Sequence, residues 1–374
     1  KEMMVRSEAE LAAFVADAGE PLSVQGGNTR GFAGGGKAVS VAGLSGITLY
    51  EPGALTMVVQ AGTPVAEVEA ALAQENQRLA FEPMDHCGLI GTKGAPTLGG
   101  VFAANISGPR RITVGAARDF LLGVRFVDGR GVVVKNGGRV MKNVTGYDLV
   151  KLMAGSFGTL GILSEVSFKV LPRVETQASL VLHGLDVGQA VGAMSRAMGS
   201  PFEVSGAAHD PAAGQTVLRV EGFETSVAYR VEQLKAVLKG SAPEMTVLTP
   251  SASEMFWGKQ RDVAAFHGTM GDVWRVSCKP SDAPALVGKA RAEAYLIDWA
   301  GGLIWLRMEQ GRDVRARLGW FDGHATLVRA STQTKAQLGV FQPEAHGVAK
   351  LTAGLRARFD PKGLFNAGLM GTVT

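Results

Sequence analysis

Cysteine is almost absent from this chain of 374 residues, since Cys87 and Cys278 are its only two. They lie far apart, which gives no disulfide framework and no cysteine-based zinc site, and a reducing compartment such as the cytoplasm is the simplest expectation. Charged residues are also few, at 19%, and the net charge of +4 is not gathered into a basic tract. A nucleic-acid surface needs such a tract, so we expect no nucleic-acid partner.

Long hydrophobic runs are missing as well. No stretch of 18 apolar residues occurs, so we expect no membrane-spanning helix, and any membrane association would come only through a partner. The first nineteen residues carry Glu2, Glu8, Glu10 and Asp17, which is unlike a secretory signal peptide. We therefore expect a cytoplasmic protein that is at most peripheral on the inner membrane.

Two common phosphate-binding fingerprints and a histidine cluster are also missing. The pattern G-x-G-x-x-G does not occur, so a Rossmann-type dinucleotide site has no support. Residues 31–38 nearly match a P-loop, but Ala38 replaces the Ser or Thr that would bind Mg²⁺. No two of the six histidines lie within four residues of each other, and isolated histidines are more often solvated or core residues than ligands, so we expect no metal site.

Glycine, in contrast, is abundant, with 50 residues and no collagen-like period. Three glycine-rich segments follow strand-like runs, at 26–31, 97–108 and 155–161. Glycine lets backbone N–H groups approach a phosphate because no side chain blocks the way. One such segment is as consistent with a simple turn. Three in one region, with Thr or Asn interleaved, predict a dinucleotide site held by a non-Rossmann architecture.

Local patterns predict the elements around these segments. A helix is expected at 7–18, where Ser7 and Glu10 form a capping box. A second is expected to begin at Pro64, with Thr63 as its N-cap, and a third at 149–154. Strands are expected at 22–25, 57–61 and 162–171, and a hairpin joins 124–127 to 132–134. Further strands are expected at 217–220, 273–277, 303–308 and 325–328. Further helices are expected at 225–238 with Thr225 as cap, 283–294, 311–318 and 344–358.

The glycine-rich segments resemble the FAD-binding domain shared by vanillyl-alcohol oxidase, D-lactate dehydrogenases and related enzymes. The resemblance rests on VQGGNTRGF at 24–32, on the runs 97–131 and 142–172, and on FDPKGLFNAG at 359–368. It implies an α+β fold with a vanillyl-alcohol-oxidase-type FAD-binding domain of two α+β subdomains, followed by a cap domain with an antiparallel sheet and helices. The expected limits are 1–172 for the FAD-binding domain, 173–345 for the cap domain, and 346–374 for a segment that returns to the first.

A narrower resemblance is carried by GPRR at 108–111 and by MKNVTGYDLVKLMAGSFGTLG at 141–161. Both are similar to the E-subunit family of bacterial glycolate oxidases. The resemblance implies a subunit of a complex that oxidises glycolate, a small 2-hydroxy acid, to glyoxylate. It also implies two partners, a sister flavoprotein subunit and an iron–sulfur subunit that receives electrons from the flavin.

The resemblance also implies which residues bind the cofactor. Those expected at the pyrophosphate are Gly26, Gly27, Asn28 and Thr29. Those expected at the flavin and ribitol are Thr97, Gly99, Gly100, Asn105 and Gly108. Gly161 and Ile162 are expected beside the adenine half, and Asn366 near the isoalloxazine. Some relatives attach FAD covalently through a His at the place of Asn28. Asn has no nucleophilic ring nitrogen, so the departure from those relatives predicts noncovalent FAD here.

Catalytic residues cannot be assigned from the sequence. Related catalytic subunits carry a metal-binding G-H-x-G-D-G-N-x-H motif, and only Gly323-His324 echoes it. Arg275 on a predicted strand can clamp a carboxylate, but a cross-strand surface charge is the favoured interpretation. Two alternatives stay open. The chain can be an independent FAD-dependent oxidoreductase for another alcohol or hydroxy acid, or a non-catalytic assembly subunit.

Overall fold

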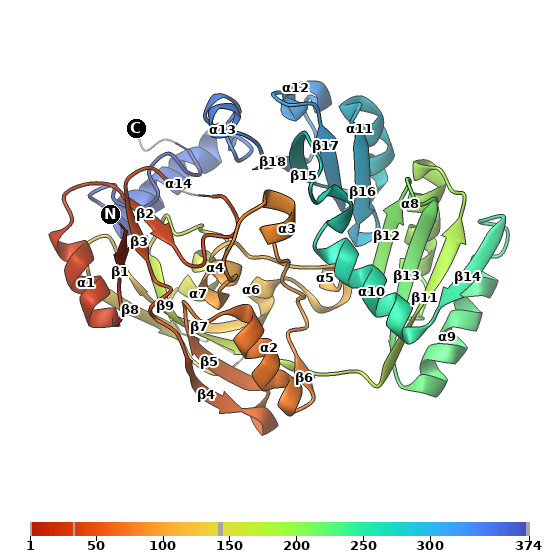
Figure 1. Ribbon diagram of the computed structural model, residues 1–374, viewed down its shortest axis with the longest axis horizontal. Coiled ribbons are helices and arrows are strands. Elements are labelled where there is room, and N and C mark those ends of the chain that lie inside the picture. Colours follow the sequence, from red (N-terminus) through yellow and green to blue (C-terminus); the bar gives the residue numbers. More distant parts are fainter. Residues whose placement is uncertain (1, 33, 141–144, 372–374) are drawn as a thin grey trace.

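The computed structural model describes residues 2–32, 34–140 and 145–371 (Figure 1). Within them, the chain forms two large bodies, one around a five-stranded sheet and one around an eight-stranded sheet. Figure 1 shows the two bodies beside each other, with the C-terminal helix returning to the first body near the N-terminus. Residues 141–144, which open the glycolate-oxidase-like motif 141–161, lie outside the described residues.

The first body begins with a small parallel sheet of order β1-β3-β2. Its elements are β1 (Met3–Met4), α1 (Glu8–Asp17), β2 (Leu22–Gln25) and β3 (Lys37–Ser40). The predicted first helix is confirmed, since the side chain of Ser7 accepts a hydrogen bond from the backbone N of Glu10. Leu11 and Val15 of α1 are buried against Leu22, which fixes the point where the first glycine-rich loop starts.

A five-stranded antiparallel sheet of order β4-β5-β9-β7-β8 forms the rest of the first body. Its strands are β4 (Ile47–Glu51), β5 (Thr56–Gln60), β7 (Leu121–Val127), β8 (Val133–Gly137) and β9 (Ile162–Lys169). The predicted hairpin is confirmed, and Asp128 Oδ1 closes it by accepting from the backbone N of Arg130 and of Val132. Phe102, Phe126 and Phe168 fill the core beneath this sheet.

Short helices and strands connect these layers. They are η1 (Pro52–Ala54), α2 (Val65–Gln74), β6 (Gln77–Arg78), α3 (Cys87–Ile90), α4 (Leu98–Ala103), α5 (Arg111–Val114), α6 (Ala117–Phe120), α7 (Leu149–Met153) and β10 (Leu171–Pro172). The predicted cap of α2 is wrong by one residue, because Pro64 is its N-cap. The Thr63 hydroxyl instead donates to the carbonyl of Gln60.

The second body is an eight-stranded antiparallel sheet of order β14-β11-β13-β12-β16-β17-β15-β18. Its strands are β11 (Thr176–His183), β12 (Gly206–Asp210), β13 (Gln215–Gly222), β14 (Glu244–Leu248), β15 (Asp272–Cys278), β16 (Ala294–Asp298), β17 (Leu303–Met308) and β18 (Gly323–Arg329). The predicted antiparallel sheet with helices is thus confirmed.

Helices and turns complete the chain. They are α8 (Val187–Met198), α9 (Glu224–Val237), α10 (Pro250–Arg261), η2 (Ala264–Phe266), η3 (Pro280–Asp282), α11 (Ala283–Ala290), η4 (Trp299–Gly301), α12 (Val314–Leu318), α13 (Thr332–Leu338) and α14 (His346–Phe359). Two predicted limits are wrong. Phe223, not Thr225, is the N-cap of α9. The helix predicted at 283–294 ends at Ala290, because Arg291 is left-handed with φ 49°.

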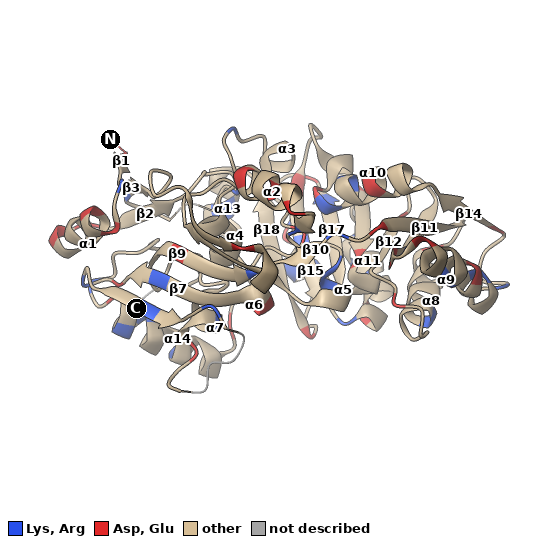
Figure 2. Cartoon of the chain, turned by 90° about the horizontal axis from the view of Figure 1, so that it is seen from below, with Lys and Arg blue, Asp and Glu red and all other residues tan. Residues whose placement is uncertain are grey.

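A buried ionic network joins the two bodies. Arg219 of β13, with a side chain only 1% exposed, pairs at 2.9 Å with Glu82 of the first body. Arg110 pairs with Glu221 of β13 at 2.9 Å and with Glu82 at 3.1 Å, and Arg78 also pairs with Glu221. In Figure 2, charged residues of both signs lie between β10, α5 and the larger sheet. The network therefore fixes how the second body sits on the first.

Candidate cofactor site

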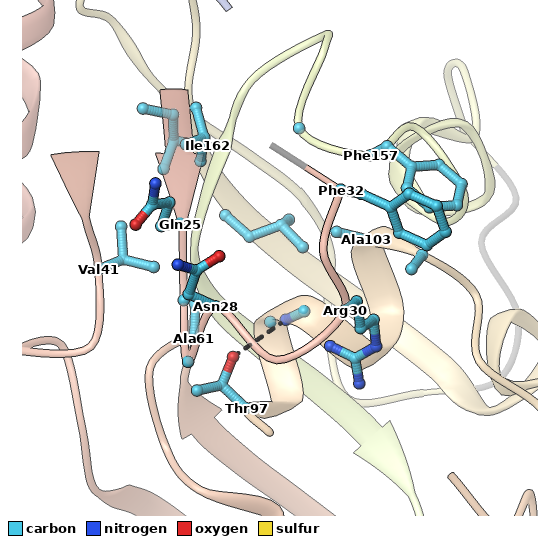
Figure 3. A pocket seen from close by; sticks show the side chains of 18 of the residues that line it. Gln25, Asn28, Arg30, Phe32, Val41, Ala61, Thr97, Ala103, Phe157 and Ile162 are labelled. Carbon is cyan, nitrogen blue, oxygen red and sulfur yellow. Dashed lines mark hydrogen bonds between the residues drawn. The ribbon is translucent and has the colours of Figure 1, made fainter. Parts of the chain in front are cut away.

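A cavity in the first body is lined by all three glycine-rich segments (Figure 3). Its space, open mouth included, is about 790 Å³. The lining consists of residues 24–32, Val41, Ala61, Thr97, Gly99, Gly100, Ala103, Ala104, residues 156–158, residues 161–163 and Asn366, with Ala33 outside the described residues.

Most of the predicted cofactor residues meet at this cavity. Those that line it are Gly26, Gly27, Asn28, Thr29, Thr97, Gly99, Gly100, Gly161, Ile162 and Asn366. Asn105 and Gly108 are outside the lining. The Asn105 side chain accepts from the backbone N of Arg118, and the Gly108 carbonyl accepts from Trp299 Nε1 at 3.0 Å. A contact of these two residues with a cofactor stays a prediction.

The first loop is shaped by close backbone packing. A Cβ added to Gly27 would lie 1.7 Å from the carbonyl oxygen of Ala95, and one added to Gly26 would lie 2.6 Å from Thr97 Oγ1. Asn28 is left-handed with φ 52°. The backbone N–H groups of Gly27, Asn28 and Thr29 donate to no described residue. Unpaired N–H groups in a tight glycine loop are a common anion-binding arrangement.

Helix α4 forms the wall beside this loop. Thr97 is its N-cap and accepts from the backbone N of Gly100 at 3.3 Å, the dashed line in Figure 3. A Cβ on Gly99 would lie 2.7 Å from Ala61, the residue that follows β5. The glycines in α4 therefore let the helix press against the sheet and bring its backbone to the cavity.

Asn366 joins the first and third segments. It is 2% exposed, its Oδ1 accepts from the backbone N of Val24, and its Nδ2 donates to the carbonyl of Phe157. Both polar atoms of the amide are therefore used within the protein. Asn366 holds the walls of the cavity together, and its predicted approach to an isoalloxazine stays a prediction.

Arg30 is a cavity residue that the sequence reasoning missed. Its Nε and Nη2 atoms are buried and have no hydrogen-bond partner among the described residues. Burial lowers the pKa of Arg30 to about 10, although Asp85 and the Cys87 thiol partly offset the effect. A desolvated cation without a partner is costly unless an anion joins it. The signal available in the sequence was a basic residue directly after the glycine-rich turn.

Phe32 and Phe157 were also missed. They lie together at one end of the cavity in Figure 3, with ring centroids 5.5 Å apart, while Val41 and Ile162 lie at the other end. Phe157 is left-handed with φ 53°, so its loop is held in a strained form. The cavity thus has apolar ends and a polar middle formed by the first loop, which suits a ligand with two ring systems joined by a charged linker.

Arg275 corrects the sequence interpretation. The favoured surface charge is wrong, because Arg275 is half-buried and its guanidinium lies 5.0 Å from the ring centroid of Trp299. Burial and the neighbouring Arg111 lower the pKa of Arg275 to about 10. His324 of the faint histidine motif is exposed at the end of β18. The described residues contain no group of three or more His, Cys, Asp or Glu able to hold a metal ion.

Comparison with known proteins defines the class. Residues 3–137 match the family model of an FAD binding domain. Alkyldihydroxyacetonephosphate synthase superposes over 97% of this chain and 76% of its own, with a TM-score of 0.70 at 16% identity. A glucooligosaccharide oxidase from Acremonium strictum covers 99% of this chain and 90% of its own, with a TM-score of 0.63 at 15% identity. The chain has the fold of this class of FAD-binding proteins, and the predicted vanillyl-alcohol-oxidase-type fold is confirmed.

The sequence relatives narrow the class. Glycolate oxidase subunit GlcE of Escherichia coli (strain K12) is 35% identical over 355 residues, covering 94% of this chain and 92% of that protein. The chain belongs to the family of this subunit and is an FAD-linked oxidoreductase. Glycolate oxidase subunit GlcD of Bacillus subtilis (strain 168) is 35% identical over 127 residues, and D-lactate dehydrogenase of Anaerostipes hadrus is 34% identical over 149. The match spans 26% and 30% of those two proteins.

No helix among the described residues has the length and apolar character needed to cross a membrane.

Proposed function

We propose that this chain is the FAD-binding subunit of a glycolate oxidase complex, with a sister flavoprotein and an iron–sulfur protein as partners. The observation that supports it most is the convergence of three glycine-rich segments on one cavity in a chain that aligns with GlcE over 94% of its length. Oxidising glycolate to glyoxylate removes two electrons and two protons from the alcohol. Bound FAD would accept the two electrons and pass them to the iron–sulfur partner.

The residues of the cavity suit an extended dinucleotide. The free N–H groups of Gly27, Asn28 and Thr29 bind the pyrophosphate, and the Arg30 guanidinium neutralises part of its charge. The backbone of α4 at Gly99 and Gly100 lies along the flavin and ribitol, with Thr97 setting the first turn. Ile162, the first residue of β9, and Gly161 before it pack against the adenine half. Asn366 keeps the first and third segments at a fixed separation.

We also propose that the cofactor is held noncovalently. Covalent attachment to flavin needs a nucleophilic side chain at the ring, as in the 6-S-cysteinyl, 8α-N1-histidyl FAD of the glucooligosaccharide oxidase. The described residues that line the cavity include no His and no Cys. Asn28, at the position of the histidine in some relatives, has only an amide.

The proposed domain limits follow the two bodies. An FAD-binding domain spans 1–172, a cap domain 173–345, and a C-terminal segment 346–374 returns to the first domain. The return is supported by the hydrogen bonds that Leu22 makes with Leu364 and Asn366. We propose that the chain works in the cytoplasm and reaches the inner membrane only through its partner subunits.

Replacing Arg30 by Met is expected to weaken FAD binding by about tenfold or more, because a charge-assisted contact with the pyrophosphate is lost. The same substitution should leave the FAD-free chain as stable as before or more stable, since an unpaired buried charge is removed. Titration of apoprotein with FAD gives the affinity, and thermal unfolding of the apoprotein gives the stability. Arg30→Lys keeps the charge and should show a smaller loss. Unchanged FAD affinity in Arg30→Met would show that Arg30 does not contact the pyrophosphate.

Anaerobic reduction tests the function. The chain as purified, and the complex formed with its two partners, are mixed with glycolate while the flavin absorbance near 450 nm is followed. We expect the complex to be bleached and to yield glyoxylate, and the three proteins to copurify. Bleaching of the isolated chain by another alcohol or hydroxy acid, but not by glycolate, would favour an independent oxidoreductase. A complex whose activity survives with an FAD-free form of this chain would favour an assembly subunit.

A further inference from the structure

We propose that Arg111 and Arg275, gathered about the indole ring of Trp299, bind the carboxylate of a small hydroxy acid. The site lies where α5 of the first body meets the larger sheet, and nothing in the cofactor cavity requires it. The assignment of the ligand as substrate rests on the proposed function. The binding site itself, for a small carboxylate, rests on the contacts described below.

Strand alternation directs Arg275 toward the first body. Trp274 and Val276 of β15 are buried in the core under α8, α9 and α11, so the residues between and beyond them face the other way. Val273 on that opposite face packs with Leu89 of the first body. His324 is paired with Ser277, two residues beyond Arg275, and therefore stands on the same face. Arg275 thus points into the junction of the two bodies and not to the outer surface.

Trp299 is held firmly as the centre of this site. Its ring Nε1 donates to the carbonyl of Gly108 at 3.0 Å, across the junction, and its backbone N donates to Asp298 Oδ1 at 2.7 Å. Trp299 and the following Ala300 are both left-handed, with φ 50° and 57°. This backbone is costly for residues with side chains, and such strain concentrates at functional sites. The strained backbone thus fixes the position of the Trp299 indole at the junction of the two bodies.

Two guanidinium groups lie on this ring and neither is neutralised. The Cζ atoms of Arg111 and Arg275 are 4.6 and 5.0 Å from the ring centroid. Within the described residues, neither side chain has a carboxylate within 4.0 Å or a hydrogen-bond partner. The acid that acts on Arg111, Asp119, is exposed and pairs with Lys151. The acid that acts on Arg275, Asp298, already accepts from Trp299, and burial raises the pKa of Asp298 to about 7. It is thus a poor counter-ion for Arg275.

The neighbouring Arg110 gives the contrast. It adjoins Arg111 in the GPRR run, is more deeply buried than Arg111, and is paired with both Glu82 and Glu221. Among the described residues, the fold therefore supplies carboxylates within 4.0 Å for Arg110 and none that close for Arg111. Two unpaired guanidinium groups beside an indole offer paired N–H donors for a carboxylate and an apolar wall for a short carbon chain.

The site lies next to the cofactor cavity. Burial lowers the pKa of His86, and the nearby charges of Arg30 in the cavity and of Arg275 lower the pKa further. Phe32, which lines the cavity, packs against the apolar cluster that contains Trp299 and Trp305. A carboxylate held by Arg111 and Arg275 would thus sit close to one end of the cavity. That placement fits a substrate anchor and not a remote surface site.

The test uses the chain as purified with its flavin, and glycolate and the unreactive dicarboxylate oxalate as probes. Titration calorimetry gives the affinity, and quenching of tryptophan fluorescence reports contact with Trp299. We expect Arg275→Met and Arg111→Met each to weaken binding by at least about tenfold. Arg275→Lys should recover part of the affinity, because it restores the charge without the planar fork. Arg118→Met removes an exposed charge nearby and should change the affinity by less than about twofold.

Thermal unfolding separates binding from a structural role. Without ligand, Arg275→Met should unfold at the same temperature as the parent or higher, because a half-buried, unpaired charge is replaced by an apolar chain of similar length. Oxalate should raise the unfolding temperature of the parent and not of the variant. A lower temperature for ligand-free Arg275→Met would mark the arginine as structural and overturn the proposal.

The failures of the two proposals are distinguishable. If the parent binds neither probe in the millimolar range, or if the Arg275→Met and Arg118→Met variants bind equally well, the carboxylate site is wrong whatever the complex oxidises. If a reconstituted complex carrying Arg275→Met keeps the parental KM for glycolate, the glycolate assignment of the site is wrong while the glycolate oxidase function stands. If carboxylates bind as expected and the complex does not oxidise glycolate, the site stands and the proposed function fails.

Discussion

Gly27→Ala is expected to abolish FAD binding. The added methyl group would lie 1.7 Å from the carbonyl oxygen of Ala95, a backbone atom that no rotamer change can move. The first loop must therefore shift, and its free N–H groups leave the positions proposed for the pyrophosphate. We expect at least about a hundredfold loss of FAD affinity together with a loss of stability of about 1–3 kcal/mol.

The measurement is the FAD content of the purified variant and its uptake of added FAD. Gly35→Ala is the matched control in the same loop region, because its added methyl group would meet nothing nearer than 3.8 Å. The control should bind FAD as the parent does. A Gly27→Ala chain that retains full FAD would show that the tight packing of this loop has no part in holding the cofactor.

The second large effect is expected at the ionic network between the two bodies. Glu82→Gln removes the carboxylate that both Arg110 and Arg219 contact, and leaves Arg219, 1% exposed, without its full counter-charge. Breaking a buried pair from one side typically costs about 3–5 kcal/mol, because an uncompensated charge stays buried. Denaturant unfolding at pH 7 gives the change in free energy. Glu232→Gln, in an exposed pair with Lys235, should be close to the parent, and an equally small effect of Glu82→Gln would contradict the account.

The same network predicts how stability depends on pH. Arg219 and Arg110 hold the pKa of Glu82 and of Glu221 below the usual range against the effect of burial. The folded chain then binds fewer protons than the unfolded chain, so the contribution is complete at neutral pH. This contribution to stability declines once the pH falls below the pKa of Glu in the unfolded chain, about 4.3. It is lost as the pH reaches the lower pKa values of the two residues in the folded chain. Glu82→Gln should show a shallower loss of stability with acid than the parent.

Local signals in the sequence predicted many elements correctly. Ser7 and Glu10 form the expected start of α1, and Asp128 closes the expected hairpin. Those elements are decided by contacts between near neighbours in the chain. The caps at Thr63 and Thr225 were wrong because the hydroxyl of Thr63 is taken up by the loop before the helix and Thr225 lies inside α9.

The cofactor residues were accessible to sequence reasoning because the family resemblance covers continuous glycine-rich segments. Ten of the predicted residues line one cavity. The other two, Asn105 and Gly108, follow the C-terminal end of α4. The sequence offered Arg275 as a carboxylate clamp but favoured a surface charge, and it assigned no role to Arg30. Whether an arginine is paired depends on the carboxylates that folding brings beside it, and the acids that pair with Arg110 stand at 82 and 221. The unpaired state of Arg111, one residue on, cannot be read from the sequence.

The most direct test of the central claim is the visible spectrum of the purified chain, followed by acid precipitation. The account predicts a flavin spectrum, with FAD released into the supernatant in about equal molar amount to the protein and none left on the precipitate. Flavin that stays with the precipitate would contradict the noncovalent site. A colourless chain that also takes up no added FAD would contradict the cofactor site itself.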